Sequence, residues 1–260
     1  MDILAHNRKA WNAQAESGNP WTLPVDRGVI QRARCGDWQV ILTPNKPVPR
    51  EWFGSLAGCD LLCLASGGGQ QAPVLAAAGA RVTSFDNSDA QLERDRAVAD
   101  RDVIALRTIQ GDMADLSALS DCSFDVIFHP VANLFVPDVK PVWRECHRVL
   151  RPGGRLLSGF MNPAWFLFDH FAIEKGGPLE VRYRLPYSDA EHYDELEKRG
   201  VLNEKTPVEF GHTLTDLIGG QLAAGLLIED MFEDDWETAV TPLNDYMPFF
   251  IATLAKKFAS

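Results

Sequence analysis

Three consecutive glycines, Gly67 to Gly69, are the clearest indication of a ligand-binding turn in this sequence. They end the run D-L-L-C-L-A-S-G-G-G that begins at Asp60. Glycine has no Cβ, so the backbone can adopt positive φ and approach a ligand closely, while a following helix presents unpaired N–H groups. Asp86 comes roughly 20 positions later, where doubly wound nucleotide-binding folds place a carboxylate for ribose hydroxyls. This spacing predicts a nucleotide-like ligand, although Asp86 could instead be a turn or capping residue in the D-N-S-D segment that it opens.

His129 is the candidate general base, because it ends the apolar run F-D-V-I-F-H, which is typical of a buried strand. Ligands of open α/β sheets bind at the carboxyl ends of the strands, so a histidine there could take a proton from a substrate. Since Pro130 follows, His129 could equally hydrogen-bond the backbone or the ligand. His147 and His170 fall in helical or irregular context and are expected to be surface or packing residues.

Alternating strands and helices must position these residues. Strands are expected from Asp60 to the glycines and at residues 80–85, 105–110, 124–129, 155–160, 226–232 and 249–255. Helices are expected after the glycines, around Gln91, at residues 141–150 and at residues 217–223. This alternation predicts an α/β fold with a doubly wound, mostly parallel sheet of seven strands. The last connection is too short for a crossover helix, so the last strand should be antiparallel.

Composition limits the classes of partner. At 260 residues with 46% apolar content, the chain can bury one full α/β core. A net charge of −11 argues against nucleic acid, because phosphate backbones are bound largely by clustered Lys and Arg. The five cysteines are scattered without a C-x-x-C pair, so neither a disulfide framework nor a zinc site is expected. No signal peptide or membrane span is expected either, which favours a cytoplasmic location.

Five motifs follow one another along the chain: L-L-C-L-A-S-G-G-G-Q, V-T-S-F-D-N-S, I-Q-G-D-M-A-D-L, F-D-V-I-F-H-P and H-R-V-L-R-P-G-G-R-L-L. In order and spacing they resemble the Rossmann-like, class I S-adenosylmethionine-dependent methyltransferases, from about Asp60 to Phe160 and again at the last two strands. The resemblance implies S-adenosylmethionine as the cofactor and methyl transfer by in-line displacement as the reaction. The cofactor-binding residues that follow from it are Ala65, Ser66, Gly67, Gly69, Gln71, Asp86, Asn87, Gln91, Asp112, Met113 and His129.

The implied chemistry fits these residue types. Carboxylates at Asp86 and Asp112 can accept hydrogen bonds from a ribose diol and an exocyclic amine, and Met113 offers adenine an apolar face or else fills the core. One departure is Cys63, which stands where the family usually has an acidic residue. Without that carboxylate, the methionine end of the cofactor has one polar partner fewer, which Ser66 or the two glutamines after the glycines could replace.

Two other functions stay open. The glycine turn also satisfies the dinucleotide pattern through Gly67-x-Gly69-x-x-Ala72, and Asp86 would equally bind an NAD ribose, as in an NAD-dependent oxidoreductase. The D-M pair at residues 112–113 and the R-P-G-G turn favour the methyltransferase, and no Tyr-x-x-x-Lys pair for hydride transfer occurs. The second alternative is a non-catalytic regulatory protein that binds S-adenosylmethionine.

The chain is interpreted as one methyltransferase domain in four segments. These are an N-terminal helix and arm (1–58), the cofactor-binding core (59–160), a lid or substrate insertion after the fifth strand (161–215), and a C-terminal helix with the last two strands (216–260). Acceptor-binding residues are expected to be Trp11, Trp21, Asn133, Phe135, Trp165 and Phe168. Methyltransferases of nucleic-acid bases often carry Asp/Asn-Pro-Pro-Tyr/Phe where this chain has H-P-V-A, so a small-molecule acceptor is expected. No catalytic metal is expected, and nothing in the sequence indicates an oligomeric state.

Overall fold

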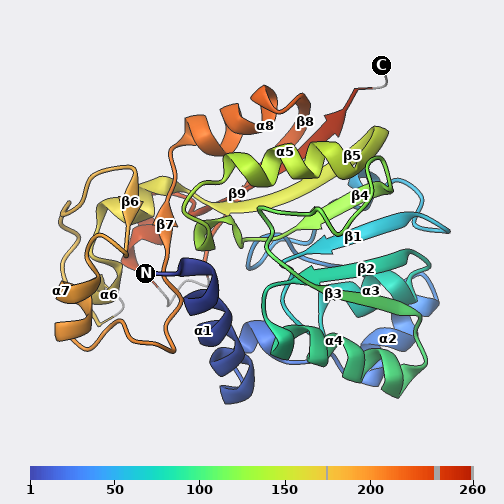
Figure 1. Ribbon diagram of the computed structural model, residues 1–260, viewed down its shortest axis with the longest axis horizontal. Coiled ribbons are helices and arrows are strands. Elements are labelled where there is room, and N and C mark those ends of the chain that lie inside the picture. The colour runs from blue at the N-terminus through green and yellow to red at the C-terminus, as the bar shows by residue number, and fades with distance from the viewer. Residues whose placement is uncertain (174, 237–240, 259–260) are drawn as a thin grey trace.

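The centre of the protein is a seven-stranded sheet in the order β3-β2-β1-β4-β5-β9-β8 (Figure 1). The computed structural model describes residues 1–173, 175–236 and 241–258. The strands are β1 (Asp60–Leu64), β2 (Arg81–Asp86), β3 (Leu106–Gln110), β4 (Phe124–His129), β5 (Leu150–Met161), β8 (Leu226–Asp234) and β9 (Phe250–Lys257). Strands β1 to β5 are parallel, and β9 pairs antiparallel with both β5 and β8. The predicted sheet, including its antiparallel last strand, is confirmed.

Helices cover both faces of the sheet, so successive strand residues enter two different hydrophobic cores. In β1, Leu61 and Cys63 face one core, and Leu62 and Leu64 face the other, all four with no exposed surface. The first core is covered by α2 (Arg27–Arg34), α3 (Gln71–Ala77) and α4 (Asp89–Asp102). The second is covered by α5 (Lys140–Val149) and by the π-helical turn Thr215–Gly219 that continues into α8 (Gly220–Ala223). A strand covered on both faces is apolar at every position, which is why β1 is so clear in the sequence.

Two details differ from the sequence-based expectation. Helix α2 lies within the N-terminal arm, where no helix was expected after the first one. Only two of its residues, Ile30 and Ala33, are buried, so the sequence shows no sustained apolar period there. The R-P-G-G run at 151–154, expected as a turn before the fifth strand, lies inside β5. There the pairing with β4 shifts register, and Gly153 adopts a φ of 79° that few other residues tolerate.

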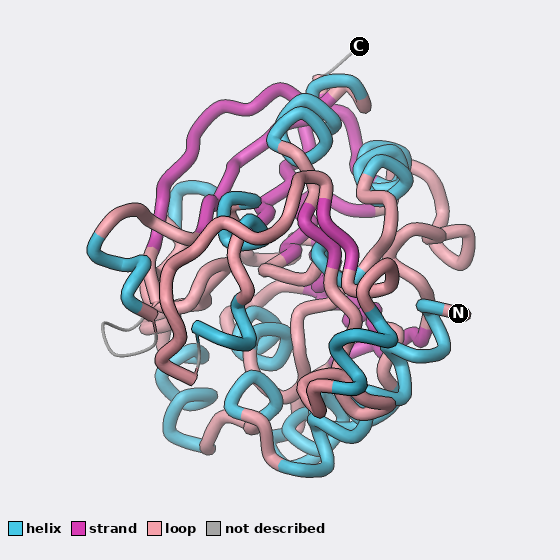
Figure 2. The backbone as a smooth tube through the Cα atoms, turned by 90° about the vertical axis from the view of Figure 1, so that its left-hand side faces the viewer, coloured by secondary structure: helices cyan, strands magenta, loops and turns pink. Residues whose placement is uncertain are grey.

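The expected insertion after β5 is a packed layer of short elements. It holds α6 (His170–Ile173), β6 (Tyr187–Ser188), α7 (Tyr193–Lys198) and β7 (Phe210–Gly211). These elements lie together at the left of the sheet in Figure 1, and Figure 2, which views that side, shows short helices and loops in front of the strands. Aromatic side chains of the layer form a third core with Phe249 and Phe250. Its action as a lid stays a prediction.

The N-terminal helix α1 (Ile3–Ser17) connects this layer to the rest of the molecule. Asp2 caps the helix by accepting from the backbone N–H of Ala5 at 3.0 Å. The buried side chain of Asn7 donates to the carbonyl groups of Phe135 and Val208, both at 3.0 Å, and accepts from the Val208 N–H at 2.8 Å. The helix is thereby fixed between the end of β4 and the segment before β7.

Candidate active site

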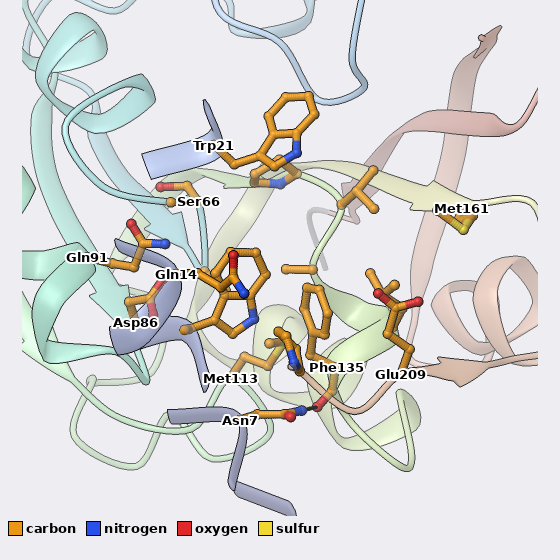
Figure 3. Close-up of a pocket in the computed structure, with 18 of the residues that line it drawn as sticks. Asn7, Gln14, Trp21, Ser66, Asp86, Gln91, Met113, Phe135, Met161 and Glu209 are labelled. Carbon is orange, nitrogen blue, oxygen red and sulfur yellow. Dashed lines mark hydrogen bonds between the residues drawn. The ribbon is translucent and has the colours of Figure 1, made fainter. Parts of the chain in front are cut away.

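A cavity of about 580 Å³ lies at the carboxyl ends of β1 and β2, within the range of small-molecule and cofactor sites. Its walls come from α1, the arm, the strand ends and the layer after β5, and Figure 3 shows side chains from these parts pointing into it. Most of the predicted site residues line it: Trp11, Trp21, Ala65, Ser66, Gly67, Gln71, Asp86, Asn87, Gln91, Asp112, Met113, Phe135 and Trp165.

Four predicted site residues are not among the described residues that line the cavity: Gly69, His129, Asn133 and Phe168. Asn133 is buried, and its Nδ2 donates to the Gly159 carbonyl at 3.3 Å, so it joins the segment after β4 to β5. Phe168 packs against the aromatic core of the layer. The structure therefore does not bring these two expected acceptor-binding residues into the cavity.

His129, the expected general base, is fully buried behind the cavity. Its Nδ1 lies 2.9 Å from the carbonyl oxygen of Leu64 on β1. Because a carbonyl oxygen can only accept, Nδ1 carries the hydrogen and donates this hydrogen bond. The ring also lies edge-on to Trp143 of α5, with centroids 6.1 Å apart. Burial lowers the pKa of His129 to about 4. An enclosed imidazole cannot reach a proton in the cavity, so the structure supports the alternative expectation, a hydrogen bond to the backbone.

The glycine turn is shaped first by the protein's own packing. Gly67 and Gly69 have φ of 72° and 77°. A Cβ on Gly67 would lie 2.8 Å from the carbonyl oxygen of Trp21, and one on Gly68 would lie 2.2 Å from that of Gln91. Real Cβ atoms essentially never show such contacts, so the arm and the start of α4 can close around the turn only because these positions are glycine.

A carboxylate that the sequence reasoning missed holds this turn. Asp95, on α4, has no exposed surface; its Oδ1 accepts from the Gly69 N–H at 2.7 Å and its Oδ2 from the Ser84 hydroxyl at 2.6 Å. Burial raises the pKa of Asp95 to about 7. Cys63 is the register partner of Ser84, whose hydroxyl Asp95 binds, so Asp95 lies near Cys63. Burial, and after it the charge of Asp95, raise the pKa of the Cys63 thiol. Asp95 thus supplies from α4 a carboxylate beside the position where Cys63 lacks one.

Five buried polar atoms of the residues that line the cavity have no hydrogen-bond partner among the described residues: the hydroxyl of Ser66, Oε1 of Gln91, both ring nitrogens of His170 and Nε1 of Trp236. Gln70 and Gln71, by contrast, already hydrogen-bond backbone groups of the arm. A buried polar atom without a partner costs roughly 1–3 kcal/mol. Of the polar residues expected around the glycines, Ser66 and Gln91 thus keep an unused hydrogen-bonding atom in the cavity wall, whereas the side chains of Gln70 and Gln71 are already engaged.

Asp86 and Asp112, the predicted ligands of ribose and adenine, both lie in the wall. Each uses one carboxylate oxygen locally: Asp86 accepts from the Ser88 N–H at 2.8 Å and Asp112 from the Ala114 N–H at 2.9 Å. Ser88, and not Asp86, caps α4. Burial raises the pKa of Asp86 to about 6. Hydroxyl groups of a ligand that donated to Asp86 would stabilise its charged form.

The other side of the cavity is apolar and aromatic. Its wall includes Met161, Trp165, Phe171, Trp236 and Phe250. His170 belongs to this wall as well, although the sequence suggested only a surface or packing residue. The charged lining residues are Asp86, Asp112 and Glu209, and none of the described residues that line the cavity is Lys or Arg.

Within the described residues, no cluster of three or more His, Cys, Asp or Glu is arranged to hold a metal ion. All five cysteines are free thiols. The described part of the chain also has no helix long and apolar enough to span a membrane.

Known proteins resemble this chain in sequence and in fold. A sequence profile described as a methyltransferase domain matches residues 62–158. The chain is 49% identical to the uncharacterized methyltransferase YbaJ of Bacillus subtilis, over 98% of this chain and 98% of that protein. A solved structure of an S-adenosylmethionine-dependent methyltransferase from Mesorhizobium loti shares its fold, with a TM-score of 0.61 and 21% identity over 80% of this chain and 95% of that one. A second such structure, from Methanosarcina mazei, has a TM-score of 0.58 and 16% identity over 82% of this chain and 99% of that one. The chain belongs to the methyltransferases, and its fold is that of the class I, S-adenosylmethionine-dependent enzymes.

Proposed function

We propose that the protein transfers the methyl group of S-adenosylmethionine to a small-molecule acceptor bound in the same cavity. The observation that supports this best is that one cavity is lined both by the polar residues Ser66, Asp86 and Gln91 and by the aromatic residues Trp165, Phe171 and Trp236. In Figure 3, Ser66, Asp86 and Gln91 lie on one side of the cavity, and Phe135, Met161 and Glu209 lie on the other. In this proposal residues 59–160 bind the cofactor and the layer at residues 161–215 contributes to the acceptor side. The net charge of −11 favours a small molecule over a nucleic acid.

The residues of the polar side would hold the cofactor by its hydrogen-bonding groups. Asp86 would accept from the ribose hydroxyls, Asp112 from the adenine amine with Met113 against the ring, and Ser66 would meet the methionine end. When bound, the cofactor supplies a methyl group on a sulfonium, a leaving group that needs no further activation. The protein's part is then to align the acceptor with that methyl and to exclude water, which the aromatic wall does.

Calorimetry with S-adenosylmethionine, S-adenosylhomocysteine and NAD tests the proposal. We expect the first two to bind and NAD not to bind. Asp86→Asn should weaken S-adenosylhomocysteine about tenfold or more, since a charge-assisted hydrogen bond is removed. Asp89→Asn, an exposed neighbour on α4, is the matched control and should bind as the wild type does.

Three results would decide against the proposal. Binding of NAD that depends on Asp86 would favour the oxidoreductase. Binding of S-adenosylmethionine without product on a broad acceptor panel would favour a regulatory protein. Failure to bind either S-adenosylmethionine or S-adenosylhomocysteine would overturn the cofactor assignment itself.

A further inference from the structure

His170 is a buried histidine in the cavity wall whose ring makes no hydrogen bond to the described residues. It is 4% exposed, and both Nδ1 and Nε2 lack a partner. A neutral imidazole carries one N–H donor and one acceptor nitrogen, so two polar functions are left unsatisfied. A buried polar group without a partner is destabilising, and unsatisfied groups in native structures call for an explanation. Both nitrogens are enclosed, so a ligand in the cavity would supply the missing partner only where the side chains around His170 shift to admit it.

Aromatic packing, and not hydrogen bonding, fixes the ring of His170. Its centroid lies 4.1 Å from that of Phe171 and 5.7 Å from that of Trp165, and both of these residues also line the cavity. Phe166 and Tyr187 support it at 6.0 and 6.2 Å, both edge-on. Tyr187 is itself anchored, since its hydroxyl donates to a carboxylate within the layer at 2.7 Å. The imidazole is therefore a fixed polar group set into an apolar surface.

The charge of the wall disfavours an anionic acceptor. The carboxylates of Asp86, Asp112 and Glu209 line the cavity, and the described lining residues include no Lys or Arg. Burial lowers the pKa of His170 to about 4, so at neutral pH its ring adds no positive charge. A carboxylate or phosphate on the acceptor would lose its hydration here without gaining a cationic side chain among the described lining residues.

We propose that His170 is the acceptor-binding residue of this enzyme, and that the acceptor is an uncharged ring compound whose hydroxyl group hydrogen-bonds to the imidazole. The ring system would pack against Trp165 and Phe171, and the hydroxyl would meet one ring nitrogen of His170. This inference rests on the proposed function, because it assigns the second substrate of the same cavity.

Three bicyclic probes of similar shape test the inference: naphthalene, 2-naphthol and 2-naphthoate. Their affinities are measured by quenching of tryptophan fluorescence, with the protein saturated by S-adenosylhomocysteine. We expect 2-naphthol to bind more tightly than naphthalene, because only the former can hydrogen-bond to His170. We expect 2-naphthoate to bind most weakly, because its negative charge meets no cationic side chain among the described lining residues.

His170→Phe keeps a ring of similar size and removes both nitrogens. It should weaken 2-naphthol roughly three- to tenfold, the loss of one hydrogen bond, and leave naphthalene unchanged. His170→Gln restores a donor and an acceptor and should recover part of the preference for 2-naphthol. His147→Phe is the control of the same chemistry, because His147 lies on α5 and is not among the lining residues.

The outcomes that contradict the inference are distinct from failure of the proposed function. Binding of S-adenosylhomocysteine is measured first by calorimetry. If it does not bind, the cofactor assignment is wrong. If that ligand binds but 2-naphthoate binds as tightly as 2-naphthol, or none of the three probes binds, the acceptor class is wrong. If His170→Phe weakens naphthalene as much as 2-naphthol, His170 is a packing residue. Thermal unfolding checks that the His170→Phe protein folds; its Tm should not be lower, since two unpaired polar atoms have been removed from the interior.

Discussion

The backbone N–H of Gly69 donates to Oδ1 of Asp95 at 2.7 Å, which fixes the glycine turn to the middle of α4. The other oxygen of the same carboxylate holds Ser84 on β2, so one side chain ties together the turn after β1, the neighbouring strand and a helix. Asp95 is not among the residues that line the cavity. We therefore expect it to position the cofactor-binding turn without touching the ligand.

Two substitutions of Asp95 distinguish the effect of its hydrogen bonds from the effect of its charge. In Asp95→Asn, the amide oxygen can still accept from Gly69 and the amide NH₂ can donate to the Ser84 oxygen, so stability and cofactor affinity should stay within a few-fold of wild type. Asp95→Ala leaves two buried donors without partners and should lower the free energy of unfolding by about 2–5 kcal/mol, with weaker S-adenosylhomocysteine binding. Urea unfolding and calorimetry measure both. Equal stability of the two variants would contradict this role.

Binding of S-adenosylhomocysteine should depend on pH through Asp86. Burial raises the pKa of this carboxyl to about 6 in the free protein, and ribose hydroxyls that donate to it favour the charged form, which lowers the pKa in the complex. Below about pH 6 the free protein must release a proton to bind, so affinity should fall as pH falls, by at most about tenfold per pH unit. Calorimetry across this range gives the slope. Asp86→Asn should remove it, and an unchanged slope in that variant would assign the proton to another group.

Gly68→Ala should destabilise the protein far more than an alanine at a glycine with free space around it. Its Cβ would lie 2.2 Å from the carbonyl oxygen of Gln91 and 2.8 Å from the Gln91 Cα, so backbone atoms would have to move. We expect a loss of several kcal/mol in the free energy of unfolding, or a protein that folds but does not bind S-adenosylhomocysteine. Gly219→Ala is the control, since its Cβ would meet only a Thr215 methyl carbon at 3.7 Å. Similar stability of the two variants would show that α4 yields easily at this contact.

Asn7→Ala should loosen α1 from the rest of the protein. The substitution removes three buried hydrogen bonds, to the Phe135 carbonyl and to both backbone groups of Val208, and their partners have no obvious substitute. The expected loss is about 1–3 kcal/mol, with faster hydrogen exchange in α1 and faster dissociation of bound S-adenosylhomocysteine. Lys9→Ala, on the same helix, removes a surface ion pair with Glu204 and should change stability by less than about 1 kcal/mol. Exchange rates in α1 that match between the two variants would contradict the role of Asn7.

The sheet was predictable because its strands carry their own signal. Residues 61–64 are apolar at four successive positions, as burial on both faces requires, and the glycines that follow mark the turn. The sequence also marks Asp95, which stands three residues after Leu92 and four before Ala99, at the spacing of residues that face the core. An acid at a core position is expensive to bury and therefore indicates a structural or functional partner.

The position of a residue at a strand end does not determine where its side chain points. His129 is correctly placed as the last residue of β4, but alternation along the strand turns its ring onto the sheet face against Trp143, and not into the cavity. His170 is the opposite case. Its burial depends on packing within a layer of very short elements, to which Phe249 and Phe250 contribute from far along the chain, and no local pattern encodes that arrangement.

Helix α1 has a consequence for the order in which the polypeptide folds. Its side chains His6, Asn7, Lys9 and Gln14 hydrogen-bond residues 204–208, which lie about 200 positions further along the chain. Contacts of such sequence separation carry a large loop-closure entropy and form late. Helix α1 must therefore wait until residues 204–208 have been synthesised before it can dock. The cavity that it lines is complete only at that stage, so no ligand can be enclosed there before these two distant segments meet.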